Sequence, residues 1–109
     1  ISLEYLMQRE GFDVSVARDG LQAIEAIGRD PPDLVLLDVM MPGKTGLEVC
    51  QHVRSIDSLR SVIIIMLTAK GRETDVAKGL ALGANAYVTK PFSTRALVAQ
   101  VRSLLGAGA

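Results

Sequence analysis

The stretch DLVLLDVMMPGKTG, residues 33–46, decides the fold. Residues 34–37 are apolar at every position, which is typical of a strand that is buried on both faces in a parallel sheet covered by helices. Asp38 follows this apolar run directly, and Pro42-Gly43 then predicts a turn. The stretch therefore predicts a buried parallel strand that carries a carboxylate at its end.

The rest of the chain alternates between helical and strand patterns. Apolar residues at helical spacing predict helices over residues 1–10, 21–27, 47–53, 73–82 and 96–105, with Ser93 as the N-cap of the last one. Strand patterns cover residues 12–16, 34–37, 62–67 and 86–89. Regular alternation of helices and strands predicts right-handed crossovers and a doubly wound α/β fold with an open parallel sheet.

Length and composition predict one globular domain. The chain has 109 residues, of which 49% are apolar and 22% are charged, and no apolar run approaches a membrane span of about 18 residues. Its 12 basic residues balance its 12 acidic ones, so net charge gives no case for binding nucleic acid or a membrane surface. Cys50 is the single cysteine, and with the single His52 it cannot form a structural zinc site. A single cysteine fits a reducing compartment, and the N-terminus lacks the pattern of a signal peptide. Together these features predict a cytoplasmic location.

Polar residues follow three of the predicted strands. Asp38, Thr68 and Lys90 come at or just beyond strand ends, and ligands of open α/β sheets bind at the carboxyl edge. A carboxylate can accept a phosphoryl group, a hydroxyl can bond to one of its oxygens, and an ammonium can neutralise another. Taken singly, each residue also has an ordinary interpretation as a cap, a strand-end hydroxyl or a solvated lysine. Together they favour phosphoryl chemistry.

Three segments resemble the receiver domain of two-component response regulators: DLVLLDVMMPGKTGLEV, IIIMLTAKG and GANAYVTKPF. The resemblance implies a flavodoxin-like sheet of strand order 2-1-3-4-5 and phosphorelay function. It implies that Asp38 accepts a phosphoryl group from a sensor histidine kinase or phosphotransfer protein, and that Thr68 and Lys90 contact its oxygens. It further implies Tyr87 as the switch aromatic, Gly46 as a turn glycine, Pro91 as a cis proline, and Mg²⁺ held by Asp38 and the carbonyl of Met40.

One part of the family pattern is missing from this sequence. Receivers open with an apolar strand that ends in a pair of acidic residues, which bind Mg²⁺, whereas this sequence starts at the helix that should follow. Glu4 and Glu10 lie on or after that helix and cannot replace the pair. We therefore expect residues 1–109 to be an N-terminally incomplete receiver domain, with a domain swap or a borrowed strand as the alternative. The Mg²⁺ site is expected to be incomplete in the same way.

Several functions compete with a phosphorylated switch. The main alternative is a receiver-like interaction module that is not phosphorylated. A haloacid dehalogenase phosphatase needs a second Asp where this chain has Met40, and an FMN carrier needs a phosphate loop and aromatic residues that are missing here. His52 is an ordinary solvated helix residue rather than a phosphohistidine carrier. Expected partners include an effector domain or a second copy; Arg95 and Arg102 lie on the last helix, but Asn85 and Ala86 replace the acidic residues that would pair with them in one common dimer.

Overall fold

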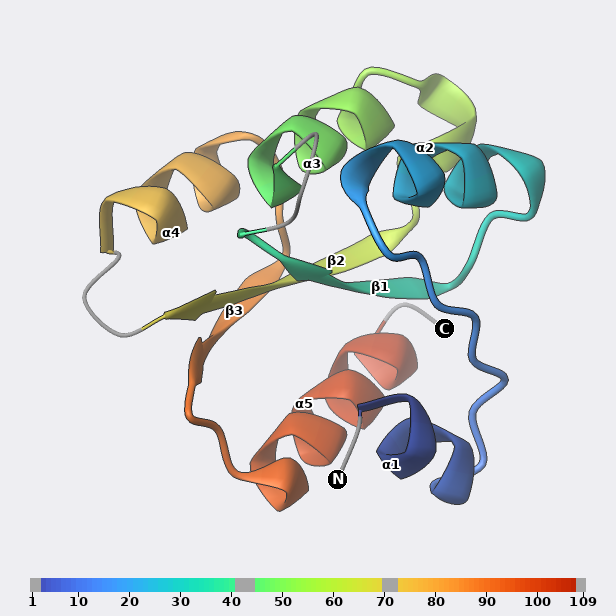
Figure 1. Cartoon of the computed structure of the whole chain (residues 1–109), viewed down its shortest axis with the longest axis vertical. Helices are drawn as coiled ribbons and strands as arrows, with labels where there is room; N and C mark the ends of the chain where they lie inside the picture. Colours follow the sequence, from blue (N-terminus) through green and yellow to red (C-terminus); the bar gives the residue numbers. More distant parts are fainter. Residues whose placement is uncertain (1–2, 41–44, 70–72, 108–109) are drawn as a thin grey trace.

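A computed structural model describes residues 3–40, 45–69 and 73–107 of the chain (Figure 1). The elements in chain order are α1 (Leu3–Arg9), α2 (Gly20–Arg29), β1 (Leu34–Asp38), α3 (Gly46–Arg54), the short 3-10 helix η1 (Asp57–Leu59), β2 (Ile63–Ala69), α4 (Glu73–Ala81), β3 (Ala86–Lys90) and α5 (Thr94–Ala107). The predicted turn at Pro42-Gly43 lies outside the described residues, as does Lys70 of the segment IIIMLTAKG. No helix among the described residues is both long and apolar enough to cross a membrane.

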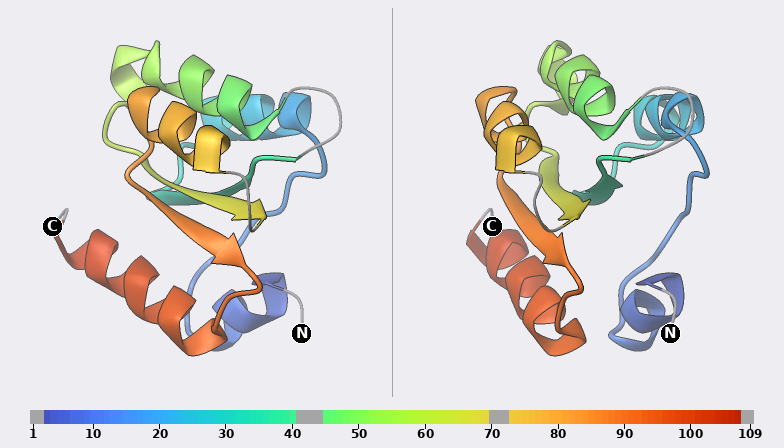
Figure 2. Two further views of the ribbon diagram at one scale, coloured as in Figure 1. Left: turned by 90° about the vertical axis from the view of Figure 1, so that its left-hand side faces the viewer. Right: turned by 60° about the vertical axis from the view of Figure 1, so that its left-hand side comes forward.

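The three strands form one parallel sheet in the order β1-β2-β3. Helices α2, α3 and α4 cover one face of this sheet, and α1 and α5 lie on the other (Figures 1 and 2). This arrangement confirms the predicted α/β class with a parallel sheet. The observed order follows the chain, so it does not test the position of any further strand in the family order 2-1-3-4-5.

Two apolar clusters fill the space on the two faces of the sheet. The cluster beneath α2 and α3 includes Val49, Val53, Ile64 and Met66, all 2% exposed or less. On the opposite face, Ile65 of β2 packs with buried residues of α1 and α5, namely Leu6, Met7, Leu97 and Val101. Since side chains alternate along a strand, β2 supplies neighbouring residues to both clusters. The parallel sheet is therefore buried on both faces along its central strand.

The strand predicted for Phe12–Val16 is wrong. Residues 12–17 have no regular secondary structure, and α1 is followed along the chain by α2 with no strand between them. The alternation of Phe12, Val14 and Val16 is a local pattern, but a strand also needs a neighbouring strand with which to exchange backbone hydrogen bonds. Within the described part of the chain, β1 pairs with β2 on one side, and no strand lies along its other edge.

Helix ends follow the predicted signals closely. Gly11, with φ 93°, ends α1, and Ser93 Oγ accepts a hydrogen bond of 3.2 Å from the N–H of Ala96 at the start of α5. At α2, the Asp19 side chain accepts from the N–H of Gln22, and the helix runs through Gly28 to Arg29, beyond its predicted end. Glycine in a helix interior is tolerated at a small cost, so the following prolines mark the end of this helix better than Gly28 does.

Candidate functional site

Asp38 ends β1 and has both carboxylate oxygens engaged. Its Oδ1 accepts a hydrogen bond of 2.9 Å from the backbone N–H of Met40. Its Oδ2 lies 2.6 Å from the Lys90 Nζ. The side chains are 35% exposed for Asp38 and 44% for Lys90, so the pair is in partial contact with solvent. A short contact between an ammonium and a carboxylate is a strong, charge-assisted hydrogen bond.

The register of the sheet explains why these two residues meet. Asp38 is level with Leu67 of β2, and Leu67 is level with Val88 of β3. Partners in register point to the same face, and Lys90 follows Val88 by the two-residue period of a strand. Asp38 and Lys90 therefore belong to the same face, and the long lysine side chain reaches across the end of β2. A cis peptide bond joins Lys90 to Pro91 directly after this point.

Thr68 and Tyr87 belong to the other face of the sheet. Thr68 follows Leu67 on β2, so the alternation of side chains puts it with Ile64 and Met66 rather than with Asp38. Thr68 is buried at 2% exposure, and its Oγ1 makes a long contact of 3.5 Å with the carbonyl of Ala69. Tyr87 is level with Met66 and is 46% exposed. The structure thus brings Asp38 and Lys90 together directly. Thr68 lies near the carboxyl end of β2 on the opposite face of the sheet, and Tyr87 of β3 belongs to the same face as Thr68.

Met40 and Asp38 are the residues that the family resemblance implies for Mg²⁺. Mg²⁺ prefers about six oxygen ligands in octahedral geometry, several of them often water. Asp38 already holds Lys90 and the Met40 N–H, and Met40 is 62% exposed. Among the described residues no group of three or more His, Cys, Asp or Glu side chains could hold a metal ion. The donors that the described residues supply at this edge do not amount to a magnesium site by themselves.

Gly46 is a structural part of the site. A Cβ at this position would lie 2.4 Å from the carbonyl oxygen of Asp38, so only glycine lets the start of α3 pack on the end of β1. The Gly46 N–H also donates to the carbonyl of Val39 at 3.1 Å. The sequence marks Gly46 only as a turn glycine, and the Met40 N–H contact to Asp38 has no signal in the sequence at all. Gly46 lets α3 approach the backbone at Asp38, and the Met40 N–H orients the Asp38 carboxylate.

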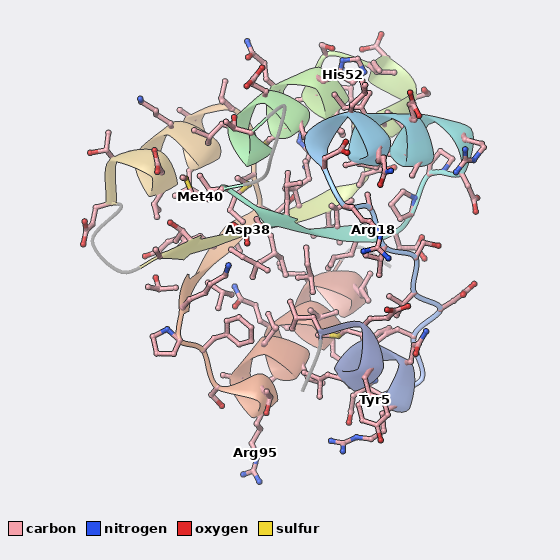
Figure 3. The ribbon with its side chains drawn as sticks, viewed as in Figure 1. Tyr5, Arg18, Asp38, Met40, His52 and Arg95 are labelled. Atoms are coloured by element: carbon pink, nitrogen blue, oxygen red, sulfur yellow. The ribbon has the colours of Figure 1, made fainter. Side chains whose placement is uncertain are left out.

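Cys50 and His52 lie away from the site on α3. Burial raises the pKa of the Cys50 thiol, while the nearby Arg54 charge lowers it by a smaller amount. A buried thiol with a raised pKa is a weak nucleophile. His52 lies on the outer side of α3, far from Asp38 (Figure 3). His52 is exposed on its helix, as expected from the sequence, and Cys50 is a buried residue of the core.

Solved structures with the same fold come from several bacteria. A response regulator from Chloroflexus aurantiacus matches with a TM-score of 0.90 and 35% sequence identity over 95% of this chain and 85% of that one. The receiver domain of a signal transduction histidine kinase from Syntrophus aciditrophicus matches with a TM-score of 0.88 and 30% identity over 96% and 80% of the two chains. The receiver domain of the sensor histidine kinase PA1611 from Pseudomonas aeruginosa matches with a TM-score of 0.87 and 30% identity over 95% and 85%, and that structure has a magnesium ion in its active-site cleft.

The fold is that of a flavodoxin-like α/β domain. The family model for the response regulator receiver domain matches residues 1–102. The chain belongs to this family, and it is a receiver domain of two-component signalling. Members of the family are phosphoacceptor signalling domains rather than typical enzymes.

Proposed function

We propose that Asp38 is the phosphoacceptor of this receiver domain and that a histidine kinase or a phosphotransfer protein is the donor. The observation that carries the proposal is the 2.6 Å contact between Lys90 Nζ and Asp38 Oδ2 at the carboxyl edge of the sheet. A carboxylate in this position is a nucleophile at a ligand-binding edge, with a cation ready to neutralise an incoming anion. The reaction would take place in the cytoplasm.

In the proposed reaction, a carboxylate oxygen of Asp38 attacks the phosphorus atom of a phosphohistidine. The new O–P bond forms as the N–P bond breaks, and the imidazole nitrogen that leaves takes up a proton. Lys90 moves from the carboxylate to a phosphoryl oxygen, where its charge offsets the charge that the phosphoryl group brings. The Met40 N–H keeps the carboxylate oriented through its 2.9 Å hydrogen bond.

Thr68 and Tyr87 would pass the change to the surface. Both belong to the α4 side of the sheet on neighbouring strands, and Thr68 is buried while Tyr87 is half exposed. In the proposed switch the Thr68 hydroxyl turns toward the phosphoryl group, and the Tyr87 ring fills the space that it leaves. The population of this second state then depends on phosphorylation, and α4, β3 and α5 present the changed surface.

Intact-mass measurement with a small acyl phosphate as donor tests the proposal, with and without added Mg²⁺. The protein should gain the mass of one phosphoryl group, and Asp38→Asn should abolish the gain. Asp33→Asn is the matched control because Asp33 is an exposed carboxylate at the opposite end of the same strand. Lys90→Met should slow the reaction by at least about tenfold, since it removes the cation that offsets the developing charge.

The second candidate is an interaction module that is not phosphorylated. The observation in its favour is that both oxygens of Asp38 are already engaged, and that residues 3–40, 45–69 and 73–107 hold no group of three or more His, Cys, Asp or Glu side chains for a metal ion. Under this interpretation the protein gains no mass from the donor at any Mg²⁺ concentration, and neither does the Asp38→Asn variant. A gain that survives in Asp38→Asn would also contradict phosphorylation of Asp38.

A further inference from the structure

The side chain of Arg54 joins three separate segments of the chain. From the last residue of α3, its Nε donates to the carbonyl of Gly83 at 2.9 Å, just before β3. Its Nη1 donates to the carbonyls of Leu59 and Arg60 at 3.4 and 3.3 Å, in the connection that leads to β2. Its Nη2 donates to Asn85 Oδ1 at 2.9 Å. One guanidinium group thus ties the entry of β2 to the entry of β3.

Asn85 continues the β2–β3 ladder with its side chain. The backbone N–H of Asn85 donates to the carbonyl of Ile64 at 2.8 Å, and the backbone N–H of Ile64 donates to Asn85 Oδ1 at 2.8 Å. The same Oδ1 atom accepts from Arg54, so the orientation of the side chain is fixed from two directions. Asn85 therefore pairs with one residue of β2 through both its backbone and its side chain.

Gly83 lets the arginine side chain pass. Its φ of 109° is one that residues with a side chain rarely adopt, and a Cβ there would lie 2.8 Å from the Arg54 Cγ. The chain at the end of α4 is thus shaped around Arg54 before β3 begins.

The apolar pattern of β3 fixes its register only weakly. β3 has five residues and lies at the edge of the sheet; Ala86 and Val88 are partly buried, whereas Tyr87, Thr89 and Lys90 are more exposed. A slip of one residue would turn every side chain of the strand to the other face. Lys90 would then leave the face that carries Asp38. Burial of Ala86 and Val88 alone contributes little free energy against such a slip, because both side chains are small and only partly buried.

We propose that Arg54 and Asn85 are positioning residues that hold the register of β3 and so keep Lys90 on the face of Asp38 and within reach of it. The argument rests on the proposed function only in treating Lys90 as part of the site. The contacts of Arg54 and Asn85 lie at the amino end of β3, and the ion pair lies at its carboxyl end. The backbone ladder between them, from Ile65↔Ala86 to Ala69↔Lys90, transmits the register from one end to the other.

Chemical labelling of the Lys90 amine tests this proposal. An ammonium bonded to Asp38 must give up that contact and its proton before its nitrogen can attack an acetylating reagent. We expect Asn85→Ala to raise the labelling of Lys90 several-fold relative to that of Lys78, an exposed lysine on α4. Asn85→Asp should keep the unmodified ratio, because a carboxylate oxygen can accept from both Ile64 and Arg54.

Two further variants separate positioning from loss of stability. Arg54→Lys keeps the charge but lacks the fork of donors, so it should raise the ratio as Asn85→Ala does. Thr45→Ala removes a cap at the opposite end of α3 and should lower stability without changing the ratio. The proposal would be overturned if the Lys90-to-Lys78 labelling ratio stayed unchanged in folded Asn85→Ala and Arg54→Lys. It would also be overturned if Thr45→Ala raised this ratio as much as those two variants do. Because labelling needs no phosphoryl donor, this result is independent of whether Asp38 is phosphorylated.

Discussion

Gly46 shows how little room the site leaves at the scale of one residue. Besides the carbonyl oxygen of Asp38, a Cβ at Gly46 would meet the carbonyl carbon of Asp38 and the Cα of Val39, each at 2.9 Å. All of these are backbone atoms, which cannot rotate away as the end of a side chain can. The requirement for glycine comes from close approach, since the backbone of Gly46 is that of an ordinary helix start.

Gly46→Ala should therefore lower the free energy of unfolding by about 1–3 kcal/mol, the usual cost of forcing extra volume into a packed region. Urea denaturation measures the change. Gly28→Ala is the matched control, because Gly28 is inside α2 with nothing within 4 Å of its added Cβ, and it should raise stability by about 0.5–1 kcal/mol. Equal effects of the two substitutions would mean that the contact with Asp38 is not tight in solution.

At the scale of elements, α3 is set in place by its N-terminus. Thr45 and Glu48 form a capping box, in which the Thr45 hydroxyl accepts from the N–H of Glu48 and the Glu48 carboxylate accepts from the N–H of Thr45. The box satisfies backbone donors that a helix start leaves open. The same helix covers the sheet with Val49 and Val53, whose exposed fractions are 0% and 1%.

Replacing Thr45 by Ala should cost about 1 kcal/mol of stability, while Thr45→Ser should be close to neutral because serine caps equally well. Thermal unfolding followed by circular dichroism gives both values. If Thr45→Ser destabilised as much as Thr45→Ala, the threonine methyl group rather than the hydroxyl would be the stabilising part.

Most elements could be predicted from the sequence because their signals are local. The apolar runs of β1 and β2, the stop signal at Gly11 and the cap at Ser93 depend on neighbouring residues only, and the structure confirms them. Residues 12–16 failed for the opposite reason. Their alternation is real, but a strand forms only where another strand lies beside it, and none lies beside residues 12–16 among the described residues.

The candidate site was predictable only in outline. Parallel strands bring their carboxyl ends to one edge, which is enough to expect Asp38 and Lys90 near each other. The face to which Thr68 belongs depends on the register of β2, and the contacts of Arg54 join residues about 30 positions apart in the chain. Neither property leaves a periodic trace in the sequence, because both arise only when the elements have packed.

At the scale of the whole molecule, Arg102 links the last helix to the start of the chain. Its Nη2 donates to the carbonyl of Glu10 at 2.8 Å and to Glu10 Oε1 at 3.1 Å, and its guanidinium lies 5.1 Å from the ring centroid of Phe12. The contact joins α5 to the segment that follows α1, on the face of the sheet where those two helices lie (Figure 2).

Arg102→Lys should loosen this layer. Lysine cannot bond two oxygens of Glu10 and stack on Phe12 at once, so we expect a loss of about 0.5–1 kcal/mol and faster amide hydrogen exchange in α1. Arg95→Lys is the control, because Arg95 is on the same helix and points away from the molecule (Figure 3). Unchanged exchange in α1 would show that apolar packing alone holds this helix.

The double role of β2 has a consequence for how the protein unfolds. Ile64 and Met66 belong to the cluster on one face of the sheet and Ile65 to the cluster on the other, so one strand contributes residues to both clusters. If one cluster unfolds, β2 loses the packing on that face, and the residues of β2 that belong to the other cluster are destabilised as well. Two cores that would otherwise be separate are thus thermodynamically coupled, and heat should break them in a single cooperative transition.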